Sequence, residues 1–128
     1  MTNETILIVW KRARRRCEYC RLRQDDAPFL KHQIEHIIPR QHGGGDHLGN
    51  LALACYRCNK FKGPNLTAFD PRTRKLVRLF NPRRQRWADH FARRGVLILG
   101  RSATGRATVE LFQMNAIKRQ TLRRENRK

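Results

Sequence analysis

Apolar residues recur at helical spacing near the start of the chain. Ile6, Val9, Trp10 and Ala13 fall on one face of residues 5–16, and the basic run KRARRR covers the opposite face. Apolar positions three and four residues apart are typical of an amphipathic helix. We therefore predict a helix over 5–16 that leads directly into the motif CEYC.

Shorter elements follow in the next fifty residues. The segment FLKHQIEHII (29–38) alternates and is rich in β-branched residues, which predicts a strand that Pro39 closes. RQHGGGDHLGN (40–50) is expected to form a glycine-rich loop. LALACYRCNKFKG (51–63) predicts a short strand or turn that runs into a helix ending by Gly63-Pro64.

The second half of the chain has a weaker pattern. LTAFDPRTRKLVRLFNP (66–82) predicts a short hairpin with its turn at DPRT. Asn81 is expected to cap a helix that carries RWADHF. GVLILG (95–100) predicts a strand, Ser102 to Gly105 a turn, and the remainder one or two helices with a frayed basic tail at 123–128. Three residues are expected in the core: Trp87, Phe91 and Leu99.

Length and charge limit the class of protein. A chain of 128 residues is long enough for one domain over 1–128, here divided into a core motif 17–63 and a basic extension 64–128. Its 29 Lys+Arg against 10 Asp+Glu give a formal net charge of +19, which indicates a polyanionic partner, nucleic acid first. An anionic membrane is less favoured because no long apolar segment is present. ETILIVW lacks a preceding basic region, so we do not predict a secretory signal. We predict a cytosolic protein instead.

All four cysteines lie in two C-x-x-C pairs, Cys17/Cys20 and Cys55/Cys58. Two such pairs can complete a tetrahedral four-sulfur zinc site. Two disulfides are an alternative, but they belong to secreted proteins. A thioredoxin-like redox role is a further alternative, but neither pair sits between a strand and a helix in a βαβ pattern.

A zinc ion shared by both pairs would fold the strand bearing Glu35 and His36 beside the helix bearing Asn59. An imidazole titrates near neutrality, so His36 is a candidate for accepting and releasing protons. A carboxylate and an amide carbonyl are hard oxygen ligands suited to a divalent cation. Neighbouring strand residues point to opposite faces, so we expect a twist or bulge to reconcile Glu35 with His36, eased by Pro39 and the glycine run.

The order C-x-x-C, EHIIP, a glycine-rich loop, N-L and C-x-x-C-N-x-x-K-G over residues 17–63 resembles the HNH endonuclease family in its four-cysteine, zinc-containing form. The resemblance implies that His36 is the general base and that Glu35 and Asn59 hold a catalytic metal. Glu35 stands where Asp or His is common and reaches one methylene further. The resemblance also implies that Asn50 fixes the loop and orients the base. Residues after 80 are more loosely similar to the C-terminal extension of a bacterial and phage subgroup.

The family resemblance implies an α+β fold, in which a small ββα-metal motif is stapled by a four-cysteine zinc site and joined by added helices and a short hairpin. It also implies a divalent-metal-dependent DNA endonuclease with structural Zn²⁺ and catalytic Mg²⁺ or Mn²⁺, encoded by a bacterium or phage and cytoplasmic. A non-catalytic, zinc-stabilised basic module that binds DNA or RNA is the alternative. DNA sequence preference, the nicking or double-strand outcome, the oligomeric state and the pathway stay open.

Several basic residues near the motif are expected to contact DNA phosphates. They are Arg12, Arg14, Arg15, Arg40, Lys60 and Lys62. The remaining histidines have no place in the motif: His32, His42 and His47 are expected to be polar loop or strand residues or phosphate contacts, and His90 a surface or packing residue.

Overall fold

The computed structural model describes residues 1–126, and the final two residues of the expected frayed tail lie outside this range. The chain forms two compact units, Met1–Pro64 and Asn65–Lys128. The expectation of a single domain over 1–128 stays a prediction. Helices and small strand hairpins alternate in both units, so the predicted α+β class is confirmed.

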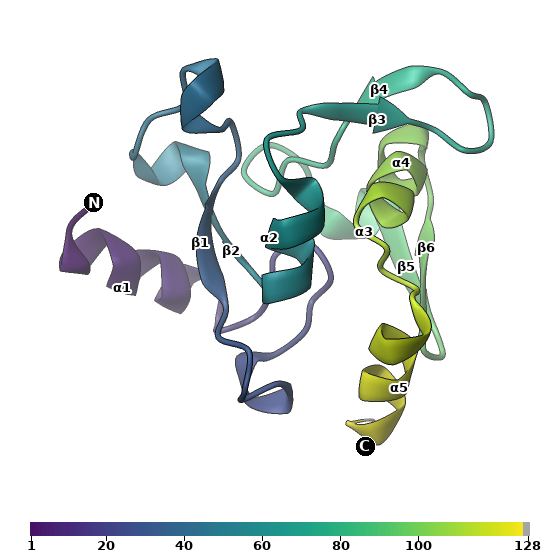
Figure 1. The fold of residues 1–128 in the computed structure, drawn as a ribbon, viewed down its shortest axis with the longest axis horizontal. Coiled ribbons are helices and arrows are strands. Elements are labelled where there is room, and N and C mark those ends of the chain that lie inside the picture. Colours follow the sequence, from purple (N-terminus) through teal and green to yellow (C-terminus); the bar gives the residue numbers. More distant parts are fainter. Residues whose placement is uncertain (127–128) are drawn as a thin grey trace. The chain divides into compact units, whose positions relative to one another are not determined.

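The first unit contains a helix, a two-stranded sheet and a second helix, with three short 3-10 helices between them (Figure 1). Its regular elements are α1 (Asn3–Arg12), β1 (Gln33–His36), β2 (Leu51–Ala54) and α2 (Tyr56–Lys62). The 3-10 helices are Gln24–Asp26, Arg40–His42 and Leu48–Asn50.

Helix α1 confirms the predicted apolar face, since Val9 and Ala13 are buried and Ile6 and Trp10 half-buried. The Thr2 side chain caps its start by accepting a hydrogen bond from the Thr5 backbone N–H. The helix ends at Arg12, four residues earlier than expected. Arg14 and Arg15 have φ of 55° and 59°, which the helix cannot continue through, and these residues turn the chain toward the first cysteine pair.

Strands β1 and β2 pair antiparallel, with Gln33 opposite Ala54 and His36 opposite Leu51. Every residue of β2 is buried. Leu51 and Leu53 pack with Val9 of α1 and with Ala13, the C-cap residue of that helix, and the half-buried Trp10 and Ile34 complete this core. Helix α2 follows β2 directly and contacts both strands, so β1, β2 and α2 form a ββα unit.

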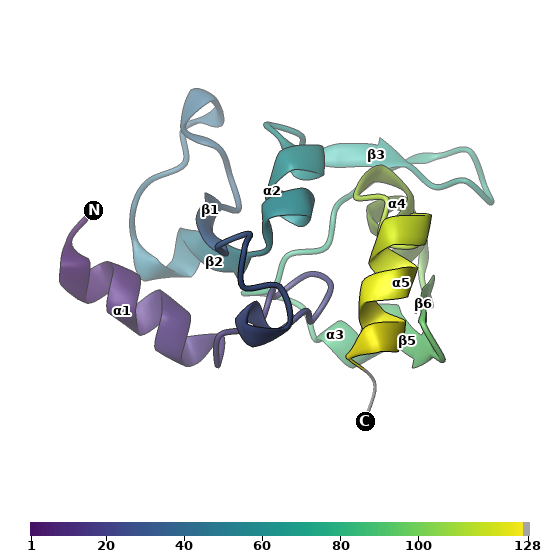
Figure 2. The same cartoon turned by 60° about the horizontal axis from the view of Figure 1, so that its bottom comes forward.

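The second unit contains two hairpins and three helices. Its elements are β3 (Thr67–Phe69), β4 (Leu76–Arg78), α3 (Trp87–His90), β5 (Phe91–Arg94), β6 (Leu97–Gly100), α4 (Ala103–Leu111) and α5 (Ile117–Glu125). Helix α4 packs against β6 and against the β3–β4 hairpin, as Figures 1 and 2 both show. The predicted hairpin at DPRT and the two C-terminal helices are confirmed.

Three expectations for this unit are wrong. The Asn81 side chain accepts backbone N–H bonds from Arg83 and Arg84, but it closes a turn, and only residues 87–90 become helical before β5 begins. Ser102 starts helix α4 by accepting from the Gly105 N–H, so 102–105 is a first helical turn and not a separate turn. The period of two in β6 places Ile98 in the core and leaves Leu99 37% exposed.

Among residues 1–126, no helix has the length and apolar character needed to cross a membrane.

Candidate functional site

The two C-x-x-C pairs converge in the first unit. Their four ligand atoms lie within 4.8 Å of one another, and all four cysteines are buried and free of disulfides. Each pair has the same local geometry: the Cys20 N–H donates to Cys17 Sγ and the Cys58 N–H to Cys55 Sγ, both at 3.4 Å. Cys55 is also the N-cap of α2, so the second pair occupies the first turn of that helix.

The sulfur spacing fits a tetrahedral metal. With Zn–S bonds of about 2.3 Å, tetrahedral geometry separates two sulfurs by roughly 3.8 Å. Cys20 Sγ and Cys55 Sγ lie 3.7 Å apart, which is far longer than the S–S bond of about 2.05 Å in a disulfide. The clustered thiols and their spacing therefore fit the predicted zinc site and not the two-disulfide alternative.

Burial raises the pKa of the Cys17 and Cys58 thiols well above their ordinary values. Burial therefore favours the protonated form of these two thiols, whereas a bound divalent ion favours the thiolates. The first pair is also fixed to the sheet, because the Glu18 N–H donates to the Leu53 carbonyl and Glu18 Oε2 accepts from the Leu53 N–H.

His36, the expected general base, lies at the end of β1 with its side chain 19% exposed. Its Nε2 is 2.7 Å from Asp46 Oδ1. Arg40 also holds this carboxylate, with Nη2 2.9 Å from Oδ1 and 3.2 Å from Oδ2. The bond to His36, followed by Arg40, lowers the pKa of Asp46, so the carboxylate is ionised at neutral pH.

Sequence reasoning missed Asp46. The only signal was its position directly after the three glycines of a loop that already contained expected site residues. Two residues can meet across a loop of nine intervening positions only if the loop folds back, and nothing in the local pattern required that.

Asn50 makes the loop fold back. Its side-chain Oδ1 accepts from the Ile38 N–H, and its Nδ2 donates to the carbonyls of Ile38 and Gly45. These bonds fasten the residue before Asp46 to the chain that follows His36. Gly44 completes the arrangement, because a Cβ at this position would lie 1.6 Å from the Ile38 carbonyl oxygen.

Glu35 points to the opposite face of β1 and is 4% exposed. Its Oε2 accepts from the Tyr19 hydroxyl at 2.7 Å, and its Oε1 lies 2.6 Å from Lys62 Nζ. Lys62 is 2% exposed and also donates to the Ile37 carbonyl oxygen. The carboxylate is thus neutralised inside the unit by an ammonium from α2, and the buried Tyr19 hydroxyl has its pKa raised well above its usual range, chiefly by burial.

Asn59 lies in α2, half-buried, and its Nδ2 donates to Gln33 Oε1. Gln33 and Glu35 are two residues apart on β1 and share a face. The structure therefore brings the strand of Glu35 beside the helix of Asn59, as the zinc geometry predicted. The register from Gln33 to His36 is unbroken, so of the expected twist or bulge this strand contains no bulge, and Glu35 and His36 face opposite ways.

Of the six basic residues expected to contact DNA, four are exposed, and the other two make side-chain bonds to the strands β1 and β2. Arg14, Arg15, Arg40 and Lys60 are exposed, whereas Lys62 is buried against Glu35. Arg12 is exposed but donates to the carbonyl oxygens of Leu48 and Leu51, which ties α1 to the start of β2.

The remaining histidines lie outside this arrangement. His32 is buried, stacks on Trp10 and bonds the Leu22 carbonyl, and burial lowers its pKa. His42 Nε2 bonds the Pro64 carbonyl, whereas His47 is exposed in the loop. In the second unit His90 Nδ1 bonds Ser102 Oγ, which makes it a packing residue of the α4 start.

The comparison with protein families bears on this segment. Residues 17–65 match the HNH endonuclease family model. The match contains both cysteine pairs, the His36–Asp46 contact and Asn59. No curated protein and no solved structure matches the chain. The HNH segment therefore indicates nuclease activity in general and carries a cluster of four cysteines that could hold zinc.

Proposed function

We propose that the chain is a divalent-metal-dependent DNA endonuclease that hydrolyses phosphodiester bonds, with one structural zinc held by Cys17, Cys20, Cys55 and Cys58. The observation that carries the proposal is the contact between His36 and an ionised carboxylate inside a segment that matches the HNH family. The clustered cysteine thiols support the expectation of a cytoplasmic protein, since reducing compartments keep cysteines available to metal.

His36 is the general base in this proposal. An ionised Asp46 can only accept, so Nε2 carries the proton in the contact, and the neutral ring then has its lone pair on Nδ1. No hydrogen bond to Nδ1 is present among residues 1–126. Nδ1 is the atom that takes a proton from the attacking water, while Asp46 stabilises the imidazolium that forms. Asn50 supports this pair through the loop and does not touch the reacting atoms.

Glu35 and Asn59 are the residues that would hold the catalytic Mg²⁺ or Mn²⁺. A carboxylate and an amide carbonyl are the oxygen donors these ions prefer, and Asn59 uses its amide nitrogen toward Gln33, which leaves its Oδ1 for a ligand. An ion held there would supply positive charge for the phosphate and the leaving oxygen, and this role requires the Glu35 carboxylate to leave Lys62 and turn toward the face that carries His36. Lys62 provides the counter-charge to Glu35 in the absence of the ion, and the two cations compete for one carboxylate.

Arg14, Arg15 and Lys60 are proposed to bind phosphates, because they are exposed cations on the unit that carries His36. Arg40 is exposed as well, but it already pairs with Asp46. We propose that it clamps this carboxylate as well as approaching the DNA backbone.

The direct test is incubation of the zinc-loaded protein with supercoiled plasmid in Mg²⁺, in Mn²⁺ and in a chelator weak enough to spare the zinc. The proposal expects relaxed or linear plasmid only when the divalent ion is present. Intact plasmid under all conditions, with DNA binding retained, would contradict it.

One observation favours the alternative of a non-catalytic zinc module. Glu35 is buried and paired with Lys62, an arrangement that stabilises a fold without any catalytic ion. The two functions differ in Mn²⁺ binding by the zinc-loaded protein. The nuclease binds Mn²⁺ at a second site that Glu35→Gln weakens, whereas the binding module shows no such site by electron paramagnetic resonance.

A further inference from the structure

The positive charge of the chain is concentrated outside the HNH core. Residues 65–128 contain 17 Lys+Arg and four Asp+Glu, so this half carries +13 of the total +19. One of its four acids, Asp70, is fully buried and paired with Arg106, which leaves few surface acids to offset the cations. A surface of this kind attracts a polyanion.

The β3–β4 hairpin is the element of this unit with the most unusual surface. Phe69 and Leu76 are paired across its two strands, and they are 64% and 58% exposed. Thr67 and Arg78 are paired on the same outward face. The other face contains Ala68 and Val77, which are half-buried in a hairpin that packs against α4. The hairpin therefore uses one face for folding and presents an apolar pair on the other.

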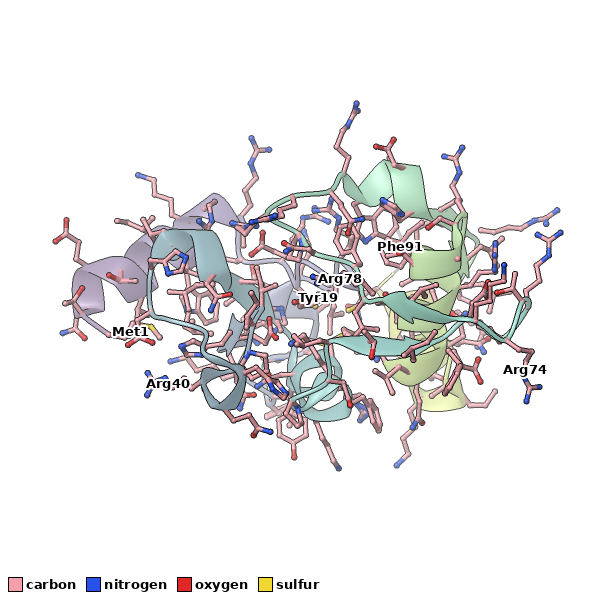
Figure 3. The ribbon with its side chains drawn as sticks, turned by 90° about the horizontal axis from the view of Figure 1, so that it is seen from above. Met1, Tyr19, Arg40, Arg74, Arg78 and Phe91 are labelled. Carbon is pink, nitrogen blue, oxygen red and sulfur yellow. The ribbon has the colours of Figure 1, made fainter. Side chains whose placement is uncertain are left out.

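The turn of this hairpin is fixed by hydrogen bonds to Asp70, including two from Arg106 of α4. Asp70 accepts from the Arg72 N–H and the Thr73 hydroxyl, and Arg106 donates to both of its oxygens, at 2.9 and 2.8 Å. The Asp70 backbone closes the turn, because its N–H donates to the Lys75 carbonyl and its carbonyl accepts from the Arg74 N–H. Arg74 has a φ of 67°, an uncommon conformation for a residue other than glycine, and projects from the end of the hairpin in Figure 3.

The fixed turn presents three cations beside the apolar pair. Arg72, Arg74 and Lys75 are all exposed, and neither arginine has an acidic partner among the ion pairs of the described residues. A two-stranded ribbon is narrow enough to enter the major groove of duplex DNA, where cations bind phosphates and apolar side chains contact thymine methyl groups. A pre-ordered turn also reduces the conformational entropy lost on binding.

We propose that the β3–β4 hairpin is a second DNA-binding element, in which Arg72, Arg74 and Lys75 contact phosphates while Phe69 and Leu76 enter a groove of duplex DNA. The inference rests on the proposed function for its choice of partner. It assigns the task of holding DNA to a part of the chain outside the family match.

The test measures binding of the zinc-loaded chain of 128 residues to a fluorescent 20-base-pair duplex without Mg²⁺ or Mn²⁺, so no cleavage is needed. Arg72→Gln with Arg74→Gln should weaken binding and reduce the log–log salt slope by about 1.8, which corresponds to two lost phosphate contacts. The matched control is Lys118→Gln with Arg124→Gln, which removes the same charge from α5. Equal losses from both pairs would show a diffuse field and overturn the proposal.

A second pair of variants tests the apolar contact. Phe69→Ala with Leu76→Ala should raise Kd at least about fivefold with little change in salt slope, because no charge is lost. Ile117→Ala, at a residue 75% exposed on α5, is the control and should bind as the parent protein does. Both Phe69 and Leu76 are exposed, so thermal unfolding should be unchanged and a folding defect is separable from a binding defect.

The outcomes distinguish this inference from the proposed function. Unchanged DNA affinity in the hairpin variants of a protein that still cuts plasmid overturns the inference alone, and indicates that the apolar pair serves another partner such as a protein. Weakened affinity in a protein that never cuts supports the inference and overturns the nuclease. A parent protein that does not bind duplex DNA overturns the inference outright.

Discussion

Loss of one zinc ligand should unfold the first unit while the second stays folded. The perturbation is Cys58→Ser, which removes a buried thiol from the first turn of α2. Structural zinc contributes an apparent binding free energy of about 10–16 kcal/mol in small zinc domains. A typical domain has a net free energy of unfolding of only about 5–15 kcal/mol. The free energy of zinc binding is therefore as large as the whole net stability of the unit, and a variant that no longer holds zinc should unfold.

The apolar core of the first unit is too small to compensate. Four buried residues make up its main cluster, and two of them, Val9 and Ala13, are small. A fully buried Val or Leu contributes about 1.5–3 kcal/mol, so this cluster stabilises the unit by less than the zinc site does. The second unit has its own core, which includes Phe80, Phe91, Ile98 and Phe112.

Tryptophan fluorescence separates the two units, because Trp10 lies in the first and Trp87 in the second. In a Trp87→Phe background, Cys58→Ser should shift Trp10 emission to the red and abolish its cooperative unfolding transition. Ala54→Ser, which places a hydroxyl in the buried strand beside Cys55, is the control and should cost only about 1–3 kcal/mol. Native Trp10 emission and an unchanged transition in a zinc-free Cys58→Ser protein would refute the reasoning.

Three further outcomes are expected. Asp46→Ala should lower kcat by about 10²-fold with KM nearly unchanged, because His36 loses the group that fixes its tautomer. The ¹⁵N chemical shifts of the His36 ring should then show a mixture of tautomers, and a single Nε2–H tautomer would contradict this. Gly44→Ala should reduce cleavage while zinc content is retained, since its Cβ would overlap the Ile38 carbonyl, whereas Gly45→Ala, which meets only the His47 ring at 3.3 Å, should be mild. Arg106 holds the pKa of Asp70 well below its usual value of about 3.9, so this ion pair stabilises the second unit fully above about pH 5 and less as the pH falls through 4 and below. The denaturation midpoint reported by Trp87 should fall over that range and fall less in Asp70→Asn, and a midpoint constant between pH 3 and 6 would count against it.

The sequence predicted the parts of the fold whose signals are local. Two C-x-x-C pairs fix their own spacing, and the apolar spacing of α1 and the turn residues at DPRT act within a few positions. The prediction that Asn81 caps a helix failed because the local sequence does not decide between two conformations. Asn81 can cap a helix or close a turn, and pairing of β5 with β6, which no local pattern announces, decided between them.

The candidate site was predicted by residue type better than by geometry. His36, Glu35, Asn50 and Asn59 could be named from their order along the chain. Their partners could not, because Asp46 and Lys62 reach them only after the loop and α2 have folded back. A charged residue in a sequence is expected at the surface, and the burial of Lys62 depends on a carboxylate 27 positions away.

One comparison tests directly whether His36 is the base of a nuclease. Parent protein and His36→Ala are assayed on supercoiled plasmid in Mg²⁺ and Mn²⁺, with zinc content and duplex affinity measured on the same preparations. We expect His36→Ala to lose cleavage but to retain about one zinc and nearly the parent affinity, since this side chain belongs to neither the zinc site nor the exposed cations. A His36→Ala protein that cuts plasmid as fast as the parent, with contaminating nuclease excluded, would contradict it.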